Sequence, residues 1–297
     1  MSRWGRSGWR GTGARSGRFD GTTFSGASPV ITSASNERIK ELLRLRRRSR
    51  GGEEVLIDGV REISRAAAAG AAILELYYCK ELWEAAPGGA LVNAVQATGA
   101  RAVEVARPVF EKIRYGDRTG GVLAVARRPH RTLDGLRLSS SPLVAVLEGV
   151  EKPGNLGAIV RTADGAGVEA VIVVDSAIDV YGPNAIRASV STIFSLPVVE
   201  TTASAARAWV LTRGMQAVAA DPAADEIYTN IDLARPTALV YGSESRGLSG
   251  VWRGAETRLV RVPMAGLADS LNVATTAAVM FYEARRQRGE RGRARSD

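Results

Sequence analysis

The sequence has 297 residues but contains one cysteine and one histidine, which excludes several kinds of site. Because Cys79 has no second cysteine to pair with, the chain cannot form an internal disulfide, as is typical of proteins in the reducing cytoplasm. Because His130 is the lone histidine, sites built from several histidines are unavailable, and we expect no metal. His130 also stands among arginines and a proline at 127–131, a setting typical of a solvated linker.

The chain also lacks long hydrophobic runs. No apolar stretch approaches the ~20 residues that span a bilayer. Residues 1–28 lack the apolar core of a signal peptide, so we expect a cytoplasmic protein without a membrane partner. Hydrophobic residues nevertheless make up 45% of the chain, which is ordinary for globular domains that bury sizeable cores.

Positive charge is in excess, with 40 Lys and Arg against 31 Asp and Glu and a net charge of +9. The arginines gather in three places, which are the stretches 1–28, 44–50 and 285–295. One basic tail can serve solubility alone, but three clusters favour a polyanionic partner, and guanidinium groups suit phosphate recognition. We therefore predict that the partner is a nucleic acid.

A chain of this length exceeds a typical single core, which favours two domains with flanking tails. Residues 1–28 are rich in Gly, Ser and Arg and are expected to form a disordered basic arm. Residues 29–128 combine short apolar strands with helical stretches, which predicts a small α/β domain. The polar stretch 129–141 is expected to be a linker, residues 142–288 the second domain, and residues 289–297 a basic tail.

In the second domain, short apolar runs alternate with helical periodicity, which is typical of a parallel sheet covered on both faces. Buried strands are expected at 143–147, 171–174, 198–199, 218–219, 239–240 and 259–262. A helix is expected to begin at Pro183 and to continue through Val190 and Ile193, because apolar residues recur there at helical spacing. The last helix is expected to begin at Ser270 and to end among arginines.

Three loops leave the carboxyl ends of these strands, where open parallel sheets bind ligands. The first contains PGNLG and leads into a helix that carries Arg161. The second contains GSESRGL, and the third contains VPMAG followed by SLNV. Each loop combines glycines, which permit close backbone approach, with small polar or charged side chains. Together the loops predict one binding site.

These loops carry a resemblance to a known family. In their order and sequence they resemble the three motifs of the SpoU branch of the SPOUT methyltransferases, which read P-G-N-x-G-x-x-x-R, G-S-E-x-x-G-L and V-P-M-x-G with S-L-N-V. The resemblance covers most of residues 143–286. It implies an enzyme that transfers a methyl group from S-adenosylmethionine to a ribose 2′-hydroxyl of RNA.

The resemblance also implies an architecture. The expected fold is α/β, a parallel sheet with a C-terminal trefoil knot, and the expected assembly is a homodimer. Knots are rare, and the periodicity alone indicates none. The face of the last helix that carries Met280 and Phe281 could serve the dimer interface or could pack on its own sheet. The first domain resembles, more weakly, the ribosomal-protein-like RNA-binding domain of many SpoU enzymes; a structural module without an RNA role is the alternative.

Site residues follow from the same resemblance. The implied cofactor-binding positions are Gly242, Val262 and Leu271, with Met264, Gly266 and Val273 close by. The implied catalytic positions are Arg161, which would activate the 2′-hydroxyl, and Asn155, Glu244, Ser270 and Asn272, which would shape the site.

Two roles for Arg161 are open. Arginine normally stays protonated, with a pKa above ~12, so a base role would need a depression of several units. We favour a guanidinium fork that grips the phosphate and ribose of the target, with proton abstraction as the family's own proposal.

Alternative functions remain at this point. Ribosomal RNA is favoured as the substrate because of the N-terminal module and the arginine clusters, and 23S ribosomal RNA is the target of antibiotic-resistance members that protect against thiostrepton or avilamycin. Transfer RNA is the other candidate substrate. A non-catalytic RNA-binding or ribosome-assembly protein would keep the fold without turnover. A nucleotide-dependent oxidoreductase would need G-x-G-x-x-G after the first strand, which is missing.

Overall fold

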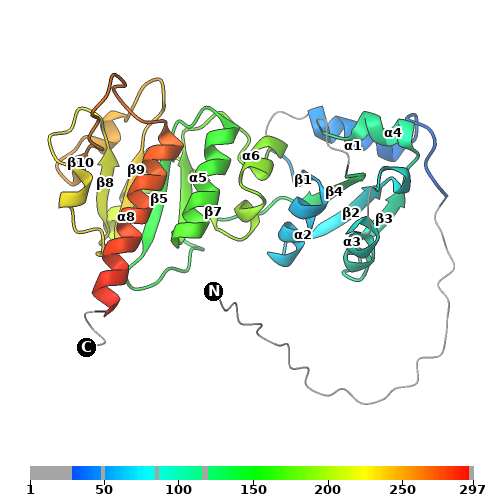
Figure 1. The fold of residues 1–297 in the computed structure, drawn as a ribbon, viewed down its shortest axis with the longest axis horizontal. Helices are drawn as coiled ribbons and strands as arrows, with labels where there is room; N and C mark the ends of the chain where they lie inside the picture. The colour runs from blue at the N-terminus through cyan, green and yellow to red at the C-terminus, as the bar shows by residue number, and fades with distance from the viewer. Residues whose placement is uncertain (1–28, 48–50, 84–86, 116–119, 294–297) are drawn as a thin grey trace, which may run out of the picture.

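The structure is a computed structural model, and it describes residues 29–47, 51–83, 87–115 and 120–293. The predicted basic arm, the end of the predicted tail at 294–297 and the arginines at 48 and 50 lie outside these described residues. The described chain forms two lobes side by side, each built on its own β-sheet (Figure 1).

The first lobe is a four-stranded sheet with helices on both faces. Its strands are β1 (Glu54–Asp58), β2 (Ile73–Tyr78), β3 (Arg101–Glu104) and β4 (Val122–Arg127), in the order β1-β4-β2-β3. Only the pair β2 and β3 is parallel. The helices are α1 (Glu37–Arg47), α2 (Val60–Ala68), α3 (Pro87–Gln96) and α4 (Arg107–Ile113). No helix was predicted at α4, which buries Val109, Phe110 and Ile113.

The second lobe is the predicted parallel sheet, and all five of its strand pairs are parallel. Its strands are β5 (Leu143–Glu148), β6 (Ala170–Val174), β7 (Val198–Thr201), β8 (Gln216–Ala220), β9 (Thr237–Tyr241) and β10 (Thr257–Val260), in the order β10-β8-β9-β5-β6-β7. The helices are α5 (Pro153–Ala166), α6 (Pro183–Ala188), α7 (Ala203–Thr212) and α8 (Val273–Arg293). None of the helices within the described residues is long and apolar enough to cross a membrane.

Both faces of this second sheet are buried, because successive side chains of each strand point to opposite faces. Along β5, Leu143 and Leu147 join the core on the side of α5 and α8, whereas Val144 and Val146 join the core on the side of α7. Met280 and Phe281 of α8 are 0% exposed within the first of these cores. The face of α8 that they form therefore packs on its own sheet.

Three predicted element boundaries are wrong. The helix that begins at Pro183 ends at Ala188 instead of continuing to Ile193, because Val190 and Ser191 adopt left-handed backbone angles with φ of 52° and 64°. Strand β10 lies two residues earlier than predicted. Helix α8 begins at Val273 rather than Ser270, since Asn272 caps it by accepting a hydrogen bond from the Ala274 amide at 2.9 Å.

Apolar packing and a buried ion cluster join the two lobes. One continuous core includes Ile57 and Ile63 of the first lobe together with Phe194 and Leu147 of the second. Arg128, which follows β4 and is 7% exposed, reaches into the second lobe. Its guanidinium donates to Asp179 at 2.8 Å and to Glu200 at 2.9 Å, and it lies 5.1 Å from the centre of the Tyr181 ring. The lobes are therefore held in one arrangement by buried contacts.

One arginine near the end of α8 makes several contacts with the rest of the second lobe. The Arg288 guanidinium donates to four backbone carbonyls, those of Ser141, Pro142, Leu233 and Arg235. These carbonyls belong to the segments that lead into β5 and β9, at the amino ends of both strands. The contact therefore anchors the far end of α8, opposite the end that begins at Val273.

A close approach of α5 to α6 gives a test of this packing. A Cβ atom on Gly157 would lie 2.4 Å from the Ala188 Cβ and 2.7 Å from the Ala185 carbonyl oxygen. We expect Gly157→Ala to lower the free energy of unfolding by about 1–3 kcal/mol, because overpacking forces the helices apart. The matched control is Gly154→Ala in the same helix, where a Cβ meets nothing within 4 Å and should not destabilise. Equal stabilities of the two variants in urea unfolding would contradict this packing.

Candidate functional site

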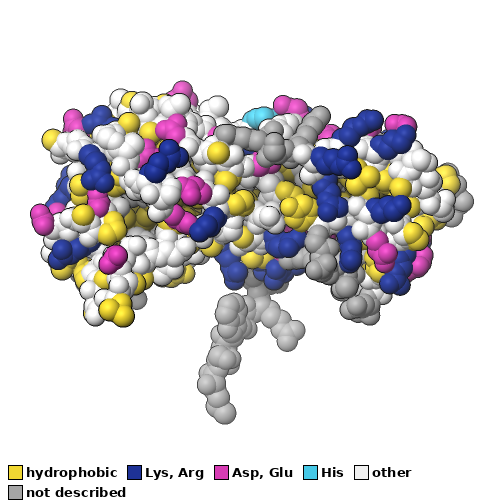
Figure 2. All heavy atoms as spheres, turned by 90° about the horizontal axis from the view of Figure 1, so that it is seen from above, with side chains coloured by type: hydrophobic (Ala, Val, Ile, Leu, Met, Phe, Trp, Pro, Cys, Tyr) yellow, Lys and Arg dark blue, Asp and Glu magenta, His cyan; other side chains and the backbone are white. Residues whose placement is uncertain are grey.

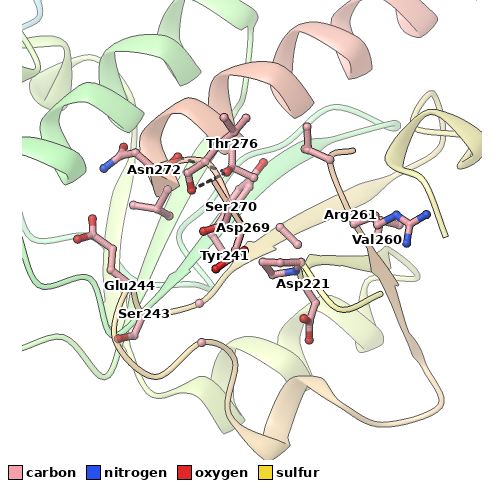
Figure 3. A pocket seen from close by; sticks show the side chains of 17 residues that line it. Asp221, Tyr241, Ser243, Glu244, Val260, Arg261, Asp269, Ser270, Asn272 and Thr276 are labelled. Carbon is pink, nitrogen blue, oxygen red and sulfur yellow. Dashed lines mark hydrogen bonds between the residues drawn. The ribbon is translucent and has the colours of Figure 1, made fainter. Parts of the chain in front are cut away.

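The described part of the chain has an open cleft of about 360 Å³ at the carboxyl edge of the second sheet (Figure 3). The ends of β8, β9 and β10 and the start of α8 form its walls, as expected for an open parallel sheet. Its lining includes both apolar and polar side chains: Ala220, Asp221, Pro222, Tyr241, Ser243, Glu244, Val260, Arg261, Val262, Asp269, Ser270, Leu271, Asn272, Val273 and Thr276, with Gly242 and Gly247.

The loop after β9 is a tight turn that glycine makes possible. The Ser243 amide donates to the Gly247 carbonyl at 3.1 Å, and the Gly247 amide donates back to the Ser243 carbonyl at 2.9 Å. A Cβ on Gly242 would lie 2.4 Å from the Gly247 carbonyl carbon, a distance shorter than Cβ atoms adopt in proteins. The bare backbone of Gly242 therefore permits the turn and leaves its own edge open to the cleft.

Two carboxylates, one at the end of β5 and one in the loop that follows, hold the loop after β9 in place. Glu148, which is 6% exposed, accepts hydrogen bonds from the Ser249 amide at 2.8 Å and from the Ser249 hydroxyl at 2.7 Å. Glu151 accepts from the hydroxyls of Ser245 and Ser243. These two hydrogen bonds lower the pKa of the Glu151 carboxyl, and the one from Ser245 has the larger effect. The first two predicted motif loops are therefore bound to each other.

A polar chain links all three loops. The Glu244 carboxylate accepts a hydrogen bond from the Asn155 amide group and forms an ion pair with Lys152 at 2.8 Å. The hydrogen bond to Glu244 raises the pKa of Lys152. The Asn155 side-chain oxygen in turn accepts from the Asn272 amide group at 3.5 Å, and Asn272 caps α8. The predicted convergence of the three loops is thereby confirmed.

The structure brings together most, but not all, of the predicted site residues. Those that line the cleft are Gly242, Glu244, Val262, Ser270, Leu271, Asn272 and Val273. Asn155 lies outside the lining and reaches it through Glu244. Met264 and Gly266 also lie outside the lining, in an exposed loop. Arg161 is exposed on α5, and no hydrogen bond or ion pair joins it to any other residue that the structure describes.

Some lining residues were not predicted from the sequence. Asp221 and Pro222 follow β8, and the Asp221 carboxylate pairs with Arg253 at 2.9 Å. The available signal was the AADP stretch at the end of a predicted strand. The hydroxyl of Tyr241 is buried without a hydrogen-bond partner in the described structure, and burial raises its pKa well above the ordinary value. Tyr241 could not be singled out because it reads as an ordinary strand residue.

The composition of the cleft fits S-adenosylmethionine. Its volume lies within the range of small-molecule sites. Val260, Val262, Leu271 and Val273 supply apolar walls for an aromatic base, and the orphan hydroxyl of Tyr241 has capacity for one more hydrogen bond. Three carboxylates reach the lining, of which Asp221 is paired with Arg253 and Glu244 with Lys152. The third, Asp269, suits a cation such as a sulfonium. Among the described residues, no group of three or more Asp, Glu, His or Cys side chains could hold a metal ion.

The chain is similar to known methyltransferases. Residues 142–282 match the SpoU rRNA Methylase family, and residues 36–124 match the MRM3-like substrate binding domain. The chain is 34% identical to the 23S rRNA (uridine(2479)-2′-O)-methyltransferase of Streptomyces viridochromogenes, over 82% of this chain and 85% of that protein. It is 29% identical to the 23S rRNA (adenosine(1067)-2′-O)-methyltransferase of Streptomyces laurentii, over 89% and 98% of the two chains.

Two solved structures have the same overall fold. A crystal structure of an RNA 2′-O ribose methyltransferase is 40% identical with a TM-score of 0.72, and the match covers 88% of this chain and 99% of that one. The SpoU methyltransferase AviRb from Streptomyces viridochromogenes, in complex with the cofactor AdoMet, is 31% identical with a TM-score of 0.76, and the match covers 86% and 100%. The likeness therefore extends over both lobes.

The turn after β9 provides a test of the cleft. We expect Gly242→Ala to weaken S-adenosylmethionine binding by more than about tenfold, because the added Cβ displaces the Gly247 backbone. A valine at this position would act in the same way, by deforming the loop rather than only by blocking the cofactor. Isothermal titration calorimetry measures the affinity. Gly250→Ala is the control, since its Cβ would meet nothing within 4 Å, and equal affinities of the two variants would contradict the assignment.

Proposed function

The chain belongs to the SpoU rRNA Methylase family and is an S-adenosylmethionine-dependent RNA 2′-O-methyltransferase, and we propose that its substrate is 23S ribosomal RNA. The observation that carries the proposal is the meeting of all three motif loops at one cleft of suitable size and charge. Both curated relatives described above are named for 2′-O-methylation of 23S ribosomal RNA, which supports this substrate over transfer RNA. Antibiotic resistance as a consequence of the modification stays a proposal, which the resemblance to resistance members of the family implies.

The residues of the cleft divide into two roles in this proposal. The cofactor would lie against Gly242, Val262, Leu271 and Val273, with Met264 and Gly266 at the entrance. When bound, S-adenosylmethionine supplies a methyl group made electrophilic by its sulfonium centre. The Asp269 carboxylate at the lining would favour this positive charge.

Arg161 would act on the RNA rather than on the cofactor. Its side chain is exposed and has no described partner, so its forked donors are available to a phosphate and a ribose oxygen. A guanidinium beside the target ribose would stabilise negative charge as it develops on the 2′-oxygen. Asn155, Glu244, Ser270 and Asn272 would hold the edge of the cleft so that the hydroxyl lies in line with the methyl group, and orientation supplies much of the rate gain.

The finer architecture is part of the same proposal. The segment from Val262 to Val273 and the turn from Gly242 to Gly247 border the same cleft, as a trefoil knot in the C-terminal part of the chain would require. An experimental structure in which this segment passes outside the turn would overturn the knot. The first lobe, within residues 29–128, would bind RNA, which its match to a substrate-binding domain supports. Residues 142–288 would then form the methyltransferase domain, with 129–141 between the two.

We also propose that the enzyme works as a homodimer. Leu267 is fully exposed and Met264 is partly exposed in the loop beside the cleft, and Tyr282 is 53% exposed on the outer face of α8. A second copy would cover these apolar side chains. Light scattering should give the mass of two chains, and a mass of one chain at micromolar concentration would overturn this assembly.

The activity is tested by mapping 2′-O-methyl groups on a 23S ribosomal RNA transcript after incubation with the protein and S-adenosylmethionine. We expect one new methylated nucleotide with the native protein. Arg161→Ala should lower the rate by at least about a hundredfold while cofactor affinity stays the same, because the side chain faces the RNA. Arg213→Ala, just after α7, is the control and should keep the rate. Methylation of a transfer RNA instead would replace the substrate, and normal turnover of Arg161→Ala would remove this residue from the mechanism.

A further inference from the structure

A cluster of cations at the junction of the lobes has no role in the site described above. The Tyr115 ring, just after α4, is approached by two guanidinium groups. Arg46 of α1 approaches its centre to 5.4 Å, and Arg187 of α6 approaches to 5.7 Å. The first arginine belongs to the first lobe and the second to the second lobe. We call Arg46, Tyr115 and Arg187 the junction cluster.

The charges of the junction cluster are not neutralised by carboxylates within the described structure. Arg46 donates one hydrogen bond, to the Lys112 carbonyl at 3.0 Å, and Arg187 donates one, to the Tyr115 carbonyl at 3.2 Å. The nearby carboxylate of Asp58 accepts a hydrogen bond from the Tyr115 amide. A guanidinium has five donors, so most of the donors in the cluster are available to a ligand.

The surroundings of the cluster are also positive. Arg44 and Arg47 are exposed on α1, and Lys112 is exposed at the end of α4. Figure 2 shows Lys and Arg side chains gathered over the half of the molecule that the first lobe forms. Elsewhere on this half, the exposed cations Lys40, Lys80 and Arg107 are each paired with a glutamate. The junction cluster therefore differs from an ordinary solvated surface, where charges of both signs alternate.

The junction lies next to the helix that carries the catalytic motif. Arg187 is the neighbour of Ala188, whose Cβ would overlap with a Cβ placed on Gly157 of α5. Gly157 is one helical turn from Arg161, and α5, α6 and α1 follow one another across the molecule in Figure 1. A polyanion that reaches Arg161 from the first lobe would therefore pass over the junction.

We propose that the junction cluster binds a backbone phosphate of the RNA substrate and sets the distance between the nucleotide held at the cleft and the RNA held by the first lobe. Two guanidinium forks from different lobes suit a phosphate, which accepts several hydrogen bonds at once. Phosphate contacts of this kind fix register without reading the sequence. The inference rests on the proposed function, because it assumes that RNA is the substrate.

The test compares Arg46→Gln, Arg187→Gln and the double variant with the native protein. Affinity for an unmodified 23S ribosomal RNA transcript is measured across a salt series. Each single variant should bind about tenfold more weakly and should lower the log–log salt slope by up to about 0.7–0.9, the value for one phosphate contact. The double variant should lose less than the sum of the two, because both arginines hold the same phosphate.

The control is Arg213→Gln just after α7, whose guanidinium also lies over an aromatic ring, 4.8 Å from the centre of Trp209. It should leave affinity and slope unchanged. Affinity for S-adenosylmethionine and the urea midpoint, measured on every variant, report on the cleft and the fold. If the arginines only brace the lobes, the RNA affinity falls equally at all salt concentrations, the slope stays constant, and the proposal is wrong. If the native protein fails to bind the transcript, the proposed substrate is wrong instead.

Discussion

The hydrogen bonds between the loops after β5 and β9 are the constraint on which the site depends. Each loop is rich in glycine and would sample many conformations alone, since glycine loses more freedom on ordering than any other residue. Glu148, Glu151 and Glu244 remove that freedom by joining the loops at three points. Glu148 matters most, because it is buried and its loss would leave the Ser249 amide without a partner. The cleft is therefore shaped before a ligand enters, which lowers the cost of binding.

The fixed arrangement of the lobes extends this preorganisation to the RNA. Arg128 carries a charge into a nearly buried position, where breaking one ion pair would cost several kcal/mol. The shared apolar core gives no hinge at this point. Because the two lobes are held rigidly, their contacts with a folded RNA lie at a fixed separation. RNA substrates that present both contact points at that separation are therefore selected.

The sequence predicted the second sheet and the three loops well, for a physical reason. Strands such as Val171–Val174 are buried on both faces and so read as continuous apolar runs, and the motif loops have fixed spacings. The break after Ala188 was not predictable, because Val190 and Ser191 take left-handed angles that only tertiary packing supports. Asp221 was missed because strand order, which puts β8 between β9 and β10, is not encoded locally. The position of Arg161 outside the cleft depends on how α5 lies on the sheet, which spacing along a helix cannot give.

The Arg288 contact has a consequence for how the enzyme is made. Ribosomes synthesise the chain from its amino end, and the first lobe and the strands β5 to β9 emerge before α8 does. Those elements can fold early, but Ser270 to Thr276 must still be translated before one wall of the cleft exists. Arg288 is translated later still, after the segments that contain its four carbonyl partners. The last wall of the cleft and the anchor of α8 are therefore completed only after nearly the whole chain has been translated.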